Sequence, residues 1–456
     1  MSLYEQLFAS VLYPAYESVL RGRHTLRYLK EYERQQWLSP EALREIQVRK
    51  LRVLLEHCQA QVPYWRRRFA ELGFSWQDLR HPEDLAALPP VGKDEIRAHY
   101  DEMIADDWRG RTLRKSTGGS TGQPFSFEYT RESYERRMAV MLRGYGWAGV
   151  GFGTRRLDVW GTDLGLPSPA QRLKARLFDA VLRRKVLSSF DMRRDNLGDY
   201  ARTIDAWRPE VIVGYTSALE SLAEWVLENR RLAWRPSSVI TAAEMLSERQ
   251  RATIEQAFGA PVFDTYGCRE FMLLGAECEL HDGYHASDDH LVIEVADDAG
   301  RPLREGVGQV LVTDLHNWGM PFLRYANGDL ARARDADAPC ACGRGLRLFG
   351  PVEGRRLDVL RTPDGRIIPG EFFPHLLKEA ASVDRFQVRQ KRLDRLDLLI
   401  VPRGAFNPAD EAFLREHIGR ITGPETKLNI EVVPDIPLTA SGKRRVTVSE
   451  LEGSQP

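Results

Sequence analysis

The sequence predicts an α/β protein with parallel strands, followed by a smaller α+β domain. Between residues 209 and 275, short apolar runs at 211–213, 238–241 and 261–266 alternate with segments of helical pattern. Strands that alternate with helices indicate parallel βαβ units, in which ligands bind beyond the carboxyl ends of the strands. After Gly354 the pattern changes to hairpin-like strands and one helix, which is typical of an α+β domain.

The rest of the chain fits this division into two domains. Residues 1–105 have a mostly helical pattern, and Ser39-Pro40-Glu41 is typical of a helix start, with a capping hydroxyl before a first-turn proline. The stretch 290–350 is rich in strand patterns. We therefore expect a large domain over 1–353, with a helical lead-in, and a small α+β domain over 359–456.

Composition restricts the class of protein and its compartment. The chain has 65 basic and 65 acidic residues, so a net charge of zero gives no electrostatic reason to expect nucleic acid as a partner. Its five cysteines are too few and too uneven for a secreted disulfide framework, which favours a cytoplasmic location. No apolar run approaches the ~20 residues of a transmembrane helix. The apolar N-terminal helix is expected to dock on the protein or to form an interface, as in a homodimer.

A stretch of glycines and hydroxyl residues, Ser116-Thr117-Gly118-Gly119-Ser120-Thr121-Gly122, is the first candidate for chemistry. Glycines let successive backbone N–H groups face inward, hydroxyls add donors, and such a concavity binds anions. Taken alone, the stretch is equally compatible with a flexible surface turn. It also matches the nucleophile elbow G-x-S-x-G around Ser120, but that motif requires a following helix, and a strand pattern follows Pro124.

Two other segments are interpreted as turns. Gly144–Gly149 matches the dinucleotide fingerprint G-x-G-x-x-G, but the residues before it look helical rather than strand-like. We expect a glycine–aromatic turn beside a pocket instead. Arg324–Asp329 is expected to be a turn that carries an acid.

Five features occur in a fixed order along the chain: the glycine-rich stretch, the turn Tyr266-Gly267-Cys268-Arg269-Glu270, the acid Asp329, the pair Gly354-Arg355 and the late Ser441-Gly442-Lys443. This ordered set resembles the adenylate-forming superfamily. The chain is most similar to the phenylacetate-CoA ligase family, including its coenzyme F390 synthetase-like and CapK-like branch. The similarity covers nearly the whole chain, and its segments are STGGSTGQP, TAAEM, DTYGCREF, PFLRYANGD, CACGR, GR and LTASGKRR.

The resemblance implies two half-reactions. A carboxylic acid attacks the α-phosphate of ATP, which gives an acyl-adenylate and pyrophosphate, and an acceptor then displaces AMP. The acceptor implied most strongly is coenzyme A, while an amine, a carrier-protein thiol or a hydroxyl remains an alternative. A non-catalytic scaffold is disfavoured because the acids and the lysine assigned below are present. Six aromatic and apolar residues are candidate walls of the acid pocket, which fits an aryl or other apolar acid: Tyr145, Trp147, Trp160, Tyr215, Phe271 and Met272.

The resemblance also implies which residues bind the nucleotide. Ser116 to Gly122 would hold the β- and γ-phosphates. Ala243 and Glu244 would border the adenine, and Tyr266, with the adjacent Gly267, would lie next to it.

Four further residues are implied to act near the reacting centre. Glu270 would bind Mg²⁺, and Asp329 would accept hydrogen bonds from the ribose hydroxyls, as an aspartate with two oxygens can do. Arg355 would contact ribose or phosphate near the hinge. Lys443 would bridge the nucleotide and the carboxylate, since charge accumulates on the α-phosphate and cations stabilise it.

The hinge between the domains departs from the pattern of the superfamily. That pattern often reads Gly-Arg-x-Asp-Asp, whereas this chain has Gly354-Arg355-Arg356-Leu357-Asp358. We expect a hinge at 354–358 that lets the small domain move, and either Leu357 or Asp358 could be the pivot.

A zinc site is expected as well. Cys340 and Cys342 supply two thiolates on one turn, and Cys278, His285 and His281 lie in another loop. Thiolates with imidazole suit tetrahedral Zn²⁺. The chosen ligands are Cys278, His285, Cys340 and Cys342, with His281 as a substitute for His285, and the expected role is structural. The alternative is a set of buried thiols with two surface histidines.

Overall fold

The computed structural model describes residues 3–116, 125–161, 173, 177–334, 339–353, 360–368, 372–377, 379–436 and 446–451. These residues form two compact units. Unit 1 comprises Met1–Lys115, Ser126–Gly153 and Phe263–Gly354, and unit 2 comprises Ser116–Phe125, Thr154–Val262 and Arg355–Pro456. Within the described residues, no helix combines the length and the apolar character needed to cross a membrane.

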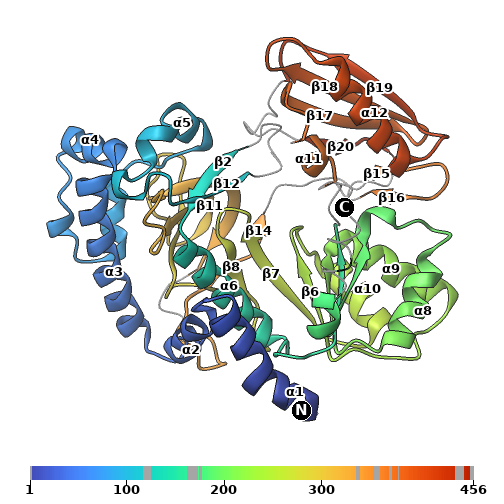
Figure 1. Ribbon diagram of the computed structural model, residues 1–456, viewed down its shortest axis with the longest axis horizontal. Helices are drawn as coiled ribbons and strands as arrows, with labels where there is room; N and C mark the ends of the chain where they lie inside the picture. The colour runs from blue at the N-terminus through green and yellow to red at the C-terminus, as the bar shows by residue number, and fades with distance from the viewer. Residues whose placement is uncertain are drawn as a thin grey trace. The chain divides into compact units, whose positions relative to one another are not determined.

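The N-terminal part of unit 1 is helical, as the sequence predicts (Figure 1). Ser39 Oγ accepts a hydrogen bond of 3.2 Å from the Ala42 amide, and Pro40 is the first helical residue, so the third helix begins where its signals predict. The helices are α1 (Leu3–Leu7), α2 (Thr25–Gln35), α3 (Pro40–Gln61), α4 (Pro63–Leu72) and α5 (Lys93–Ala98), and β1 (Leu113–Ser116) and β2 (Ser126–Tyr129) follow.

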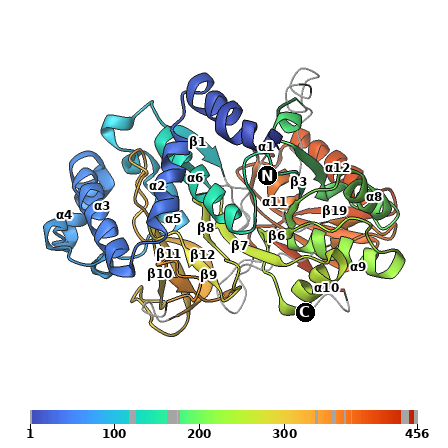
Figure 2. The ribbon, with the colours of Figure 1, turned by 90° about the horizontal axis from the view of Figure 1, so that it is seen from below.

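Two sets of strands in unit 1 pair antiparallel, and β8 of the first set lies against the long helix α6 (Arg131–Trp147) (Figure 2). One set contains β7 (Val262–Cys268), β8 (Met272–Ala276), β9 (Tyr284–Ala286) and β13 (Leu348–Phe349). The other contains β10 (Leu291–Ala296), β11 (Gly306–Asp314), β12 (Tyr325–Ala333) and β14 (Val352–Glu353).

Two expected turns of unit 1 lie mostly in regular elements, and of the segment 144–149 only Ala148 and Gly149, with φ +88° at Gly149, form a turn. Gly144 lies inside α6, where a Cβ atom would come within 2.4 Å of Leu273 Cδ2. This glycine lets the helix approach β8 closely, and it does not form a turn. The segment around Asp329 belongs to β12, because pairing with β11 holds it extended on either side of a bulge.

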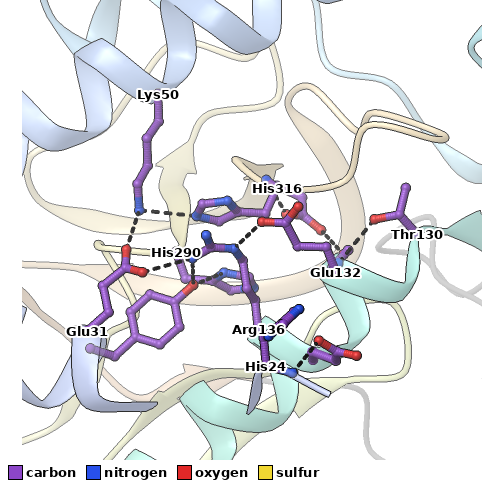
Figure 3. Close-up of polar contacts among 12 residues, drawn as sticks. His24, Glu31, Lys50, Thr130, Glu132, Arg136, His290 and His316 are labelled. Carbon is purple, nitrogen blue, oxygen red and sulfur yellow. Dashed lines mark hydrogen bonds and ion pairs between the residues drawn. The ribbon is translucent and has the colours of Figure 1, made fainter. Parts of the chain in front are cut away.

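A buried polar cluster connects the helical lead-in to the strands of unit 1 (Figure 3). Tyr32 Oη lies 3.0 Å from His290 Nδ1, and Lys50 Nζ lies 3.1 Å from His316 Nε2. Lys50 also donates a 2.7 Å bond to the carbonyl oxygen of Asp289. Burial lowers the pKa of His290 to about 3 and that of Lys50 to about 8. The residues of α2 and α3 are thereby fixed to the loops that flank β10 and β11.

Unit 2 contains the predicted parallel sheet. The strands pair in parallel in the order β4-β3-β5-β6, which confirms the α/β prediction. Ser247 and Gln250 form a reciprocal cap at the start of α10, and Gly259 ends that helix with φ +64°. The elements are β3 (Arg156–Trp160), β4 (Arg184–Ser188), β5 (Val211–Tyr215), β6 (Ser238–Ala242), α8 (Leu197–Trp207), α9 (Thr216–Asn229) and α10 (Glu248–Phe258).

The C-terminal part of unit 2 has the predicted α+β composition. Strands β17 and β18 form an antiparallel hairpin, and β19 and β20 add in parallel to its two edges. Its buried residues belong to the same hydrophobic core as those of the parallel sheet. The elements are β15 (Leu360–Arg361), β16 (Ile367–Ile368), α11 (Phe372–Leu377), β17 (Val383–Arg392), β18 (Arg395–Pro402), α12 (Pro408–Thr422), β19 (Lys427–Val432) and β20 (Thr447–Ser449).

Candidate functional site

The first component of the site is a hydrogen-bonded set of side chains on β7 and β12, here called the Tyr266 group: Tyr266, Asn327 and Asp329. Tyr266 Oη donates to Asp329 Oδ2 at 2.9 Å, and Asn327 Nδ2 donates to both Tyr266 Oη (2.6 Å) and Asp329 Oδ2 (2.9 Å). Burial, and to a smaller extent the charge of Asp329, raises the pKa of Tyr266 well above its usual value, so the hydroxyl remains protonated and can donate. Tyr266 and Asn327 are buried while Asp329 is partly exposed, which leaves the carboxylate oriented by its neighbours at an accessible position.

Local backbone geometry explains how this group forms. The register of β12 against β11 shifts opposite this stretch, and Gly328 adopts φ +90°. The resulting bulge brings Asn327 and Asp329 to the same tyrosine hydroxyl. Next to Tyr266, a Cβ atom on Gly267 would lie 1.9 Å from the carbonyl oxygen of Met272. Only glycine permits this close approach between β7 and β8.

The second component is the Glu270 group: Glu270, Tyr325 and Lys93. Glu270 is 3% exposed, accepts a 2.8 Å hydrogen bond from Tyr325 Oη, and lies 3.4 Å from Lys93 Nζ. Lys93 reaches this position because Val91, two residues earlier, forms a β-bridge with Tyr325. The Val91 amide donates a 3.1 Å hydrogen bond to the carbonyl oxygen of Arg324. Lys93 and Tyr325 thus supply a positive charge and a hydroxyl donor that stabilise this buried carboxylate.

Further positive charge surrounds Glu270. Burial, Arg269 and Arg137 together lower the pKa of Lys115 to about 8, while Glu270 opposes that change. Lys115 directly precedes Ser116, the last residue of β1 and the first of the glycine-rich stretch. This part of unit 1 therefore gathers cations around a single buried carboxylate, an arrangement suited to a phosphate chain and its metal ion.

In unit 2, Glu244 binds the start of α9. The Ser217 amide donates to Glu244 Oε2 at 2.7 Å, and Ser217 Oγ donates to Oε1 at 2.9 Å. Burial raises the pKa of this carboxyl, and the two bonds from Ser217 oppose the rise. Ala243 has φ +69°, an uncommon conformation for a residue with a Cβ atom. The carboxylate thus satisfies first-turn donors of the helix after β5.

The third component is the Cys–His cluster, formed by Cys278, His285, Cys340 and Cys342. Their four donor atoms all lie within 4.8 Å of one another. Cys278 Sγ and Cys340 Sγ are 3.8 Å apart, and Cys342 Sγ is 3.3 Å from His285 Nε2. Two thiolates bound to one tetrahedral Zn²⁺ at ~2.3 Å would be roughly 3.8 Å apart, so the donor set fits zinc.

Neighbouring groups orient the donors of this cluster. His285 Nδ1 lies 2.9 Å from the carbonyl oxygen of Leu346, which leaves Nε2 directed at the thiols. The amide of Arg344 lies 3.5 Å from Cys342 Sγ, and the rings of Trp147 and His285 pack in a T-shaped arrangement with centroids 5.5 Å apart. His281, the substitute ligand, is not among the four, and its Nδ1 lies 3.1 Å from Glu277 Oε2.

The aromatic residues expected to line a substrate pocket have varied surroundings. Trp147 packs on the Cys–His cluster, and Phe271 is fully buried against Phe322 and Tyr325. Trp160 and Tyr215 pack against each other in unit 2, with centroids 4.3 Å apart and ring planes tilted by 41°.

Several predicted residues lie outside the described part of the chain: Thr117, Gly118, Gly119, Ser120, Thr121, Gly122, Arg355, Leu357, Asp358 and Lys443. Conversely, sequence reasoning did not identify Lys93, Tyr325 and Asn327. The last two lie in the segment PFLRYANGD and alternate with Asp329, a period-2 signal that could have identified them. No local signal marks Lys93, because its partner Glu270 lies 177 positions further along the chain.

Comparisons with known proteins bear on the family to which the chain belongs. The family model for the CapK C-terminal domain matches residues 360–450. Phenylacetate-coenzyme A ligase of Thermus thermophilus is 30% identical over 376 residues, which cover 79% of this chain and 81% of that protein. Protein CapK of Staphylococcus aureus is 24% identical over 374 residues, 80% of each. A structure of 2-hydroxyisobutyryl-CoA ligase, in complex with 2-HIB-AMP and CoA, has a TM-score of 0.62 at 20% identity and 92% coverage of both chains.

Proposed function

This chain belongs to the phenylacetate-CoA ligase and CapK-like family of adenylate-forming enzymes, and from that premise we propose that the Tyr266 and Glu270 groups bind ATP during adenylation of an apolar acid. The enzyme is an acid–thiol ligase. A carboxylate oxygen of the substrate attacks the α-phosphorus of ATP, the bond to the β-phosphate oxygen breaks, and pyrophosphate leaves. The thiolate of coenzyme A then attacks the acyl carbon, and AMP leaves.

The observation that carries the nucleotide assignment is the orientation of Asp329. Its Oδ2 atom is held by Tyr266 and Asn327, so the carboxylate is fixed before a ligand arrives. A fixed carboxylate is a strong acceptor for the two hydroxyls of a ribose. Preorganisation of this kind reduces the entropy that binding must otherwise remove.

The Glu270 group is proposed to serve the phosphates. Glu270, together with phosphate oxygens, would hold Mg²⁺, which when bound neutralises phosphate charge. Lys93 lies 3.4 Å from Glu270, and we propose that it moves its charge to the phosphate chain when ATP is bound. The glycine-rich stretch from Ser116 to Gly122 would contact the leaving pyrophosphate, and Lys443 would contact the reacting carboxylate.

The Cys–His cluster is proposed to be a structural zinc site. Its donors fit a closed tetrahedral set, with no open position for a substrate. Cys278, on the segment after β8, and the turn of Cys340 and Cys342 would be joined through the ion, with His285 of β9 as the fourth ligand.

We also propose a compartment and an assembly for this protein. The five cysteines are free thiols, which supports a reducing compartment such as the cytoplasm. Val19 and Leu20 of the N-terminal segment are 79% and 78% exposed, and we propose this segment as the contact of a homodimer. Light scattering on Leu20→Glu tests it: a wild-type dimer should become monomeric, and a dimer that persists would contradict this contact.

A pyrophosphate-release screen tests the proposed reaction. The intact enzyme, with ATP and Mg²⁺, would be offered aryl, aliphatic and polar carboxylic acids, with and without coenzyme A. We expect release with apolar acids such as phenylacetate, and thioester formation only when coenzyme A is present. Parallel assays with an amine, a carrier-protein thiol or a hydroxyl acceptor test the alternatives. Absence of release with every acid would contradict the adenylation chemistry.

A further inference from the structure

We infer that a cavity in unit 1 binds an amphipathic organic anion, an apolar body that carries one carboxylate or sulfonate, and that its occupation tightens ATP binding. The cavity has a volume of about 320 Å³ and lies against α3, β10 and β13. None of the residues assigned to the nucleotide or zinc sites lines it. Its size is at the lower end of the range for small-molecule sites, which begins at roughly 300 Å³.

The walls provide an apolar surface for the body of such a ligand. Pro82, Val292, Leu303, Leu348 and Phe349 contribute to it. The α3 side is held in place because Gln47 Nε2 donates to the carbonyl oxygen of Leu291 at 2.9 Å. The cavity is therefore a preformed feature of a packed region, and a ligand would not need to open it.

The charges around the cavity leave one cation in excess. Glu294 is bound by the buried Arg324 with three contacts of 2.9–3.2 Å, and Arg347 is bound by Asp288 at 2.7 Å. Arg44 lies 3.2 Å from Glu83.

The other two arginines that line the cavity differ from each other. Arg334 is paired with Asp282, whereas Arg304 is exposed and has no ion-pair partner among the described residues. One unpaired guanidinium beside an apolar wall selects a ligand with a single negative charge.

Phe349 connects this cavity to the nucleotide assignment. It lines the cavity, and its ring also packs edge-on against Tyr266, with centroids 5.9 Å apart. β13, which carries Phe349, pairs with β9, where Tyr284 is the partner of Phe349. A ligand that immobilises Phe349 restricts Tyr266 and hence Asp329, which would favour the ATP-binding arrangement. This second step rests on the proposed function of the Tyr266 group.

The binding step is tested with 8-anilino-1-naphthalenesulfonate, an apolar fluorescent monoanion, titrated against the full chain without ATP. We expect one saturable site, and Arg304→Glu should weaken its affinity at least tenfold. Arg301→Glu is the matched control: its side chain is 81% exposed and does not line the cavity, so the affinity should change less than twofold. If Arg304→Glu and wild type bound the probe with equal affinity, the proposed anion site would be wrong.

The coupling step is tested by calorimetric titration of ATP, with and without saturating probe. We expect at least threefold tighter ATP binding with the probe, and Phe349→Leu, which removes the ring that contacts Tyr266, should remove this difference when the probe is at saturation. An ATP affinity that the probe leaves unchanged or weakens would overturn the coupling. If ATP does not bind even without the probe, the proposed function fails, and the two failures are thereby distinguished.

Discussion

The Cys–His cluster and the Tyr266 group are built on neighbouring strands of the same unit, but they differ in how complete they are. The cluster brings four donors within 4.8 Å of one another, all from residues 278–342. The Tyr266 group orients one carboxylate, and the proposed reaction also requires the stretch from Ser116 and Lys443, which is more than 100 positions further along the sequence than Asp329. A closed set of ligands serves stability, whereas a catalytic set must stay open to substrates. Removing a residue of the catalytic set should therefore reduce activity, whereas removing a ligand of the Cys–His cluster should reduce stability.

The largest expected effect comes from Lys443→Ala. We expect a loss of at least ~10³-fold in acid-dependent ATP–pyrophosphate exchange, about 4 kcal/mol, since a cation at the reacting phosphate acts mainly in the transition state. The melting temperature should stay within a degree of wild type. Lys427→Ala, at an exposed position on β19, is the control and should keep full activity. A normal rate for Lys443→Ala would mean that the catalytic set does not extend to this residue.

Cys342→Ser should produce the reverse pattern. We expect loss of about one zinc per chain, measured by plasma emission spectrometry, and a decrease of roughly 3 kcal/mol in the free energy of unfolding, because metal binding contributes to folding. Below the melting temperature, kcat should stay within threefold of wild type. Cys58→Ala, a buried cysteine outside the cluster, should retain its zinc. A Cys342→Ser enzyme with normal stability and no activity would show that the cluster takes part in catalysis. The proposed difference between the cluster and the Tyr266 group would then be wrong.

Asp329→Asn should have an intermediate effect, and it should fall on the nucleotide. Removing a charged acceptor without changing its size should reduce kcat/KM for ATP about 30-fold, roughly 2 kcal/mol. Tyr266→Phe removes only the hydroxyl that orients Asp329 and should cost roughly 1 kcal/mol. Steady-state kinetics with each substrate varied separately provides the measurement. An effect confined to the KM of the acid would contradict the ribose assignment.

The last prediction concerns stability alone and is made for Lys50, which lies in the buried polar cluster and in neither of the two sites. Burial lowers the pKa of Lys50 from 10.5 to about 8, against the opposing charges of Asp289 and Glu31. Between these two values the unfolded chain binds more protons than the folded one, so stability must rise with pH. Relative to Lys50→Met, wild type should gain roughly 2 kcal/mol between pH 7.5 and 10.

Urea unfolding at several pH values measures this gain. ATP affinity and zinc content should be the same in Lys50→Met and wild type at pH 7.5. A difference in unfolding free energy that does not vary with pH would show that Lys50 is not held in a buried state.

Local signals in the sequence were sufficient where structure depends on neighbours along the chain. Ser247 and Gly259 delimit α10 as capping rules predict, because the groups that satisfy a helix end lie within a few residues of it. They were insufficient at Gly144, where a glycine that usually marks a turn instead allows α6 to approach Leu273. Lys93 was not identified for a related reason, since the pairing of Val91 with Tyr325 is what places it beside Glu270.

The sequence by itself determined the α/β class, the order of the motifs and the chemical nature of the donors, since these follow from periodicity and residue type. Only the tertiary structure decided which histidine joins the cysteines. His285 lies opposite Leu348 in the pairing of β9 with β13, which directs its Nε2 to Cys342. His281, four positions earlier, has φ +53° and lies beside Glu277 instead. The choice depends on strand pairing across about 60 residues, and no local pattern encodes contacts at that separation.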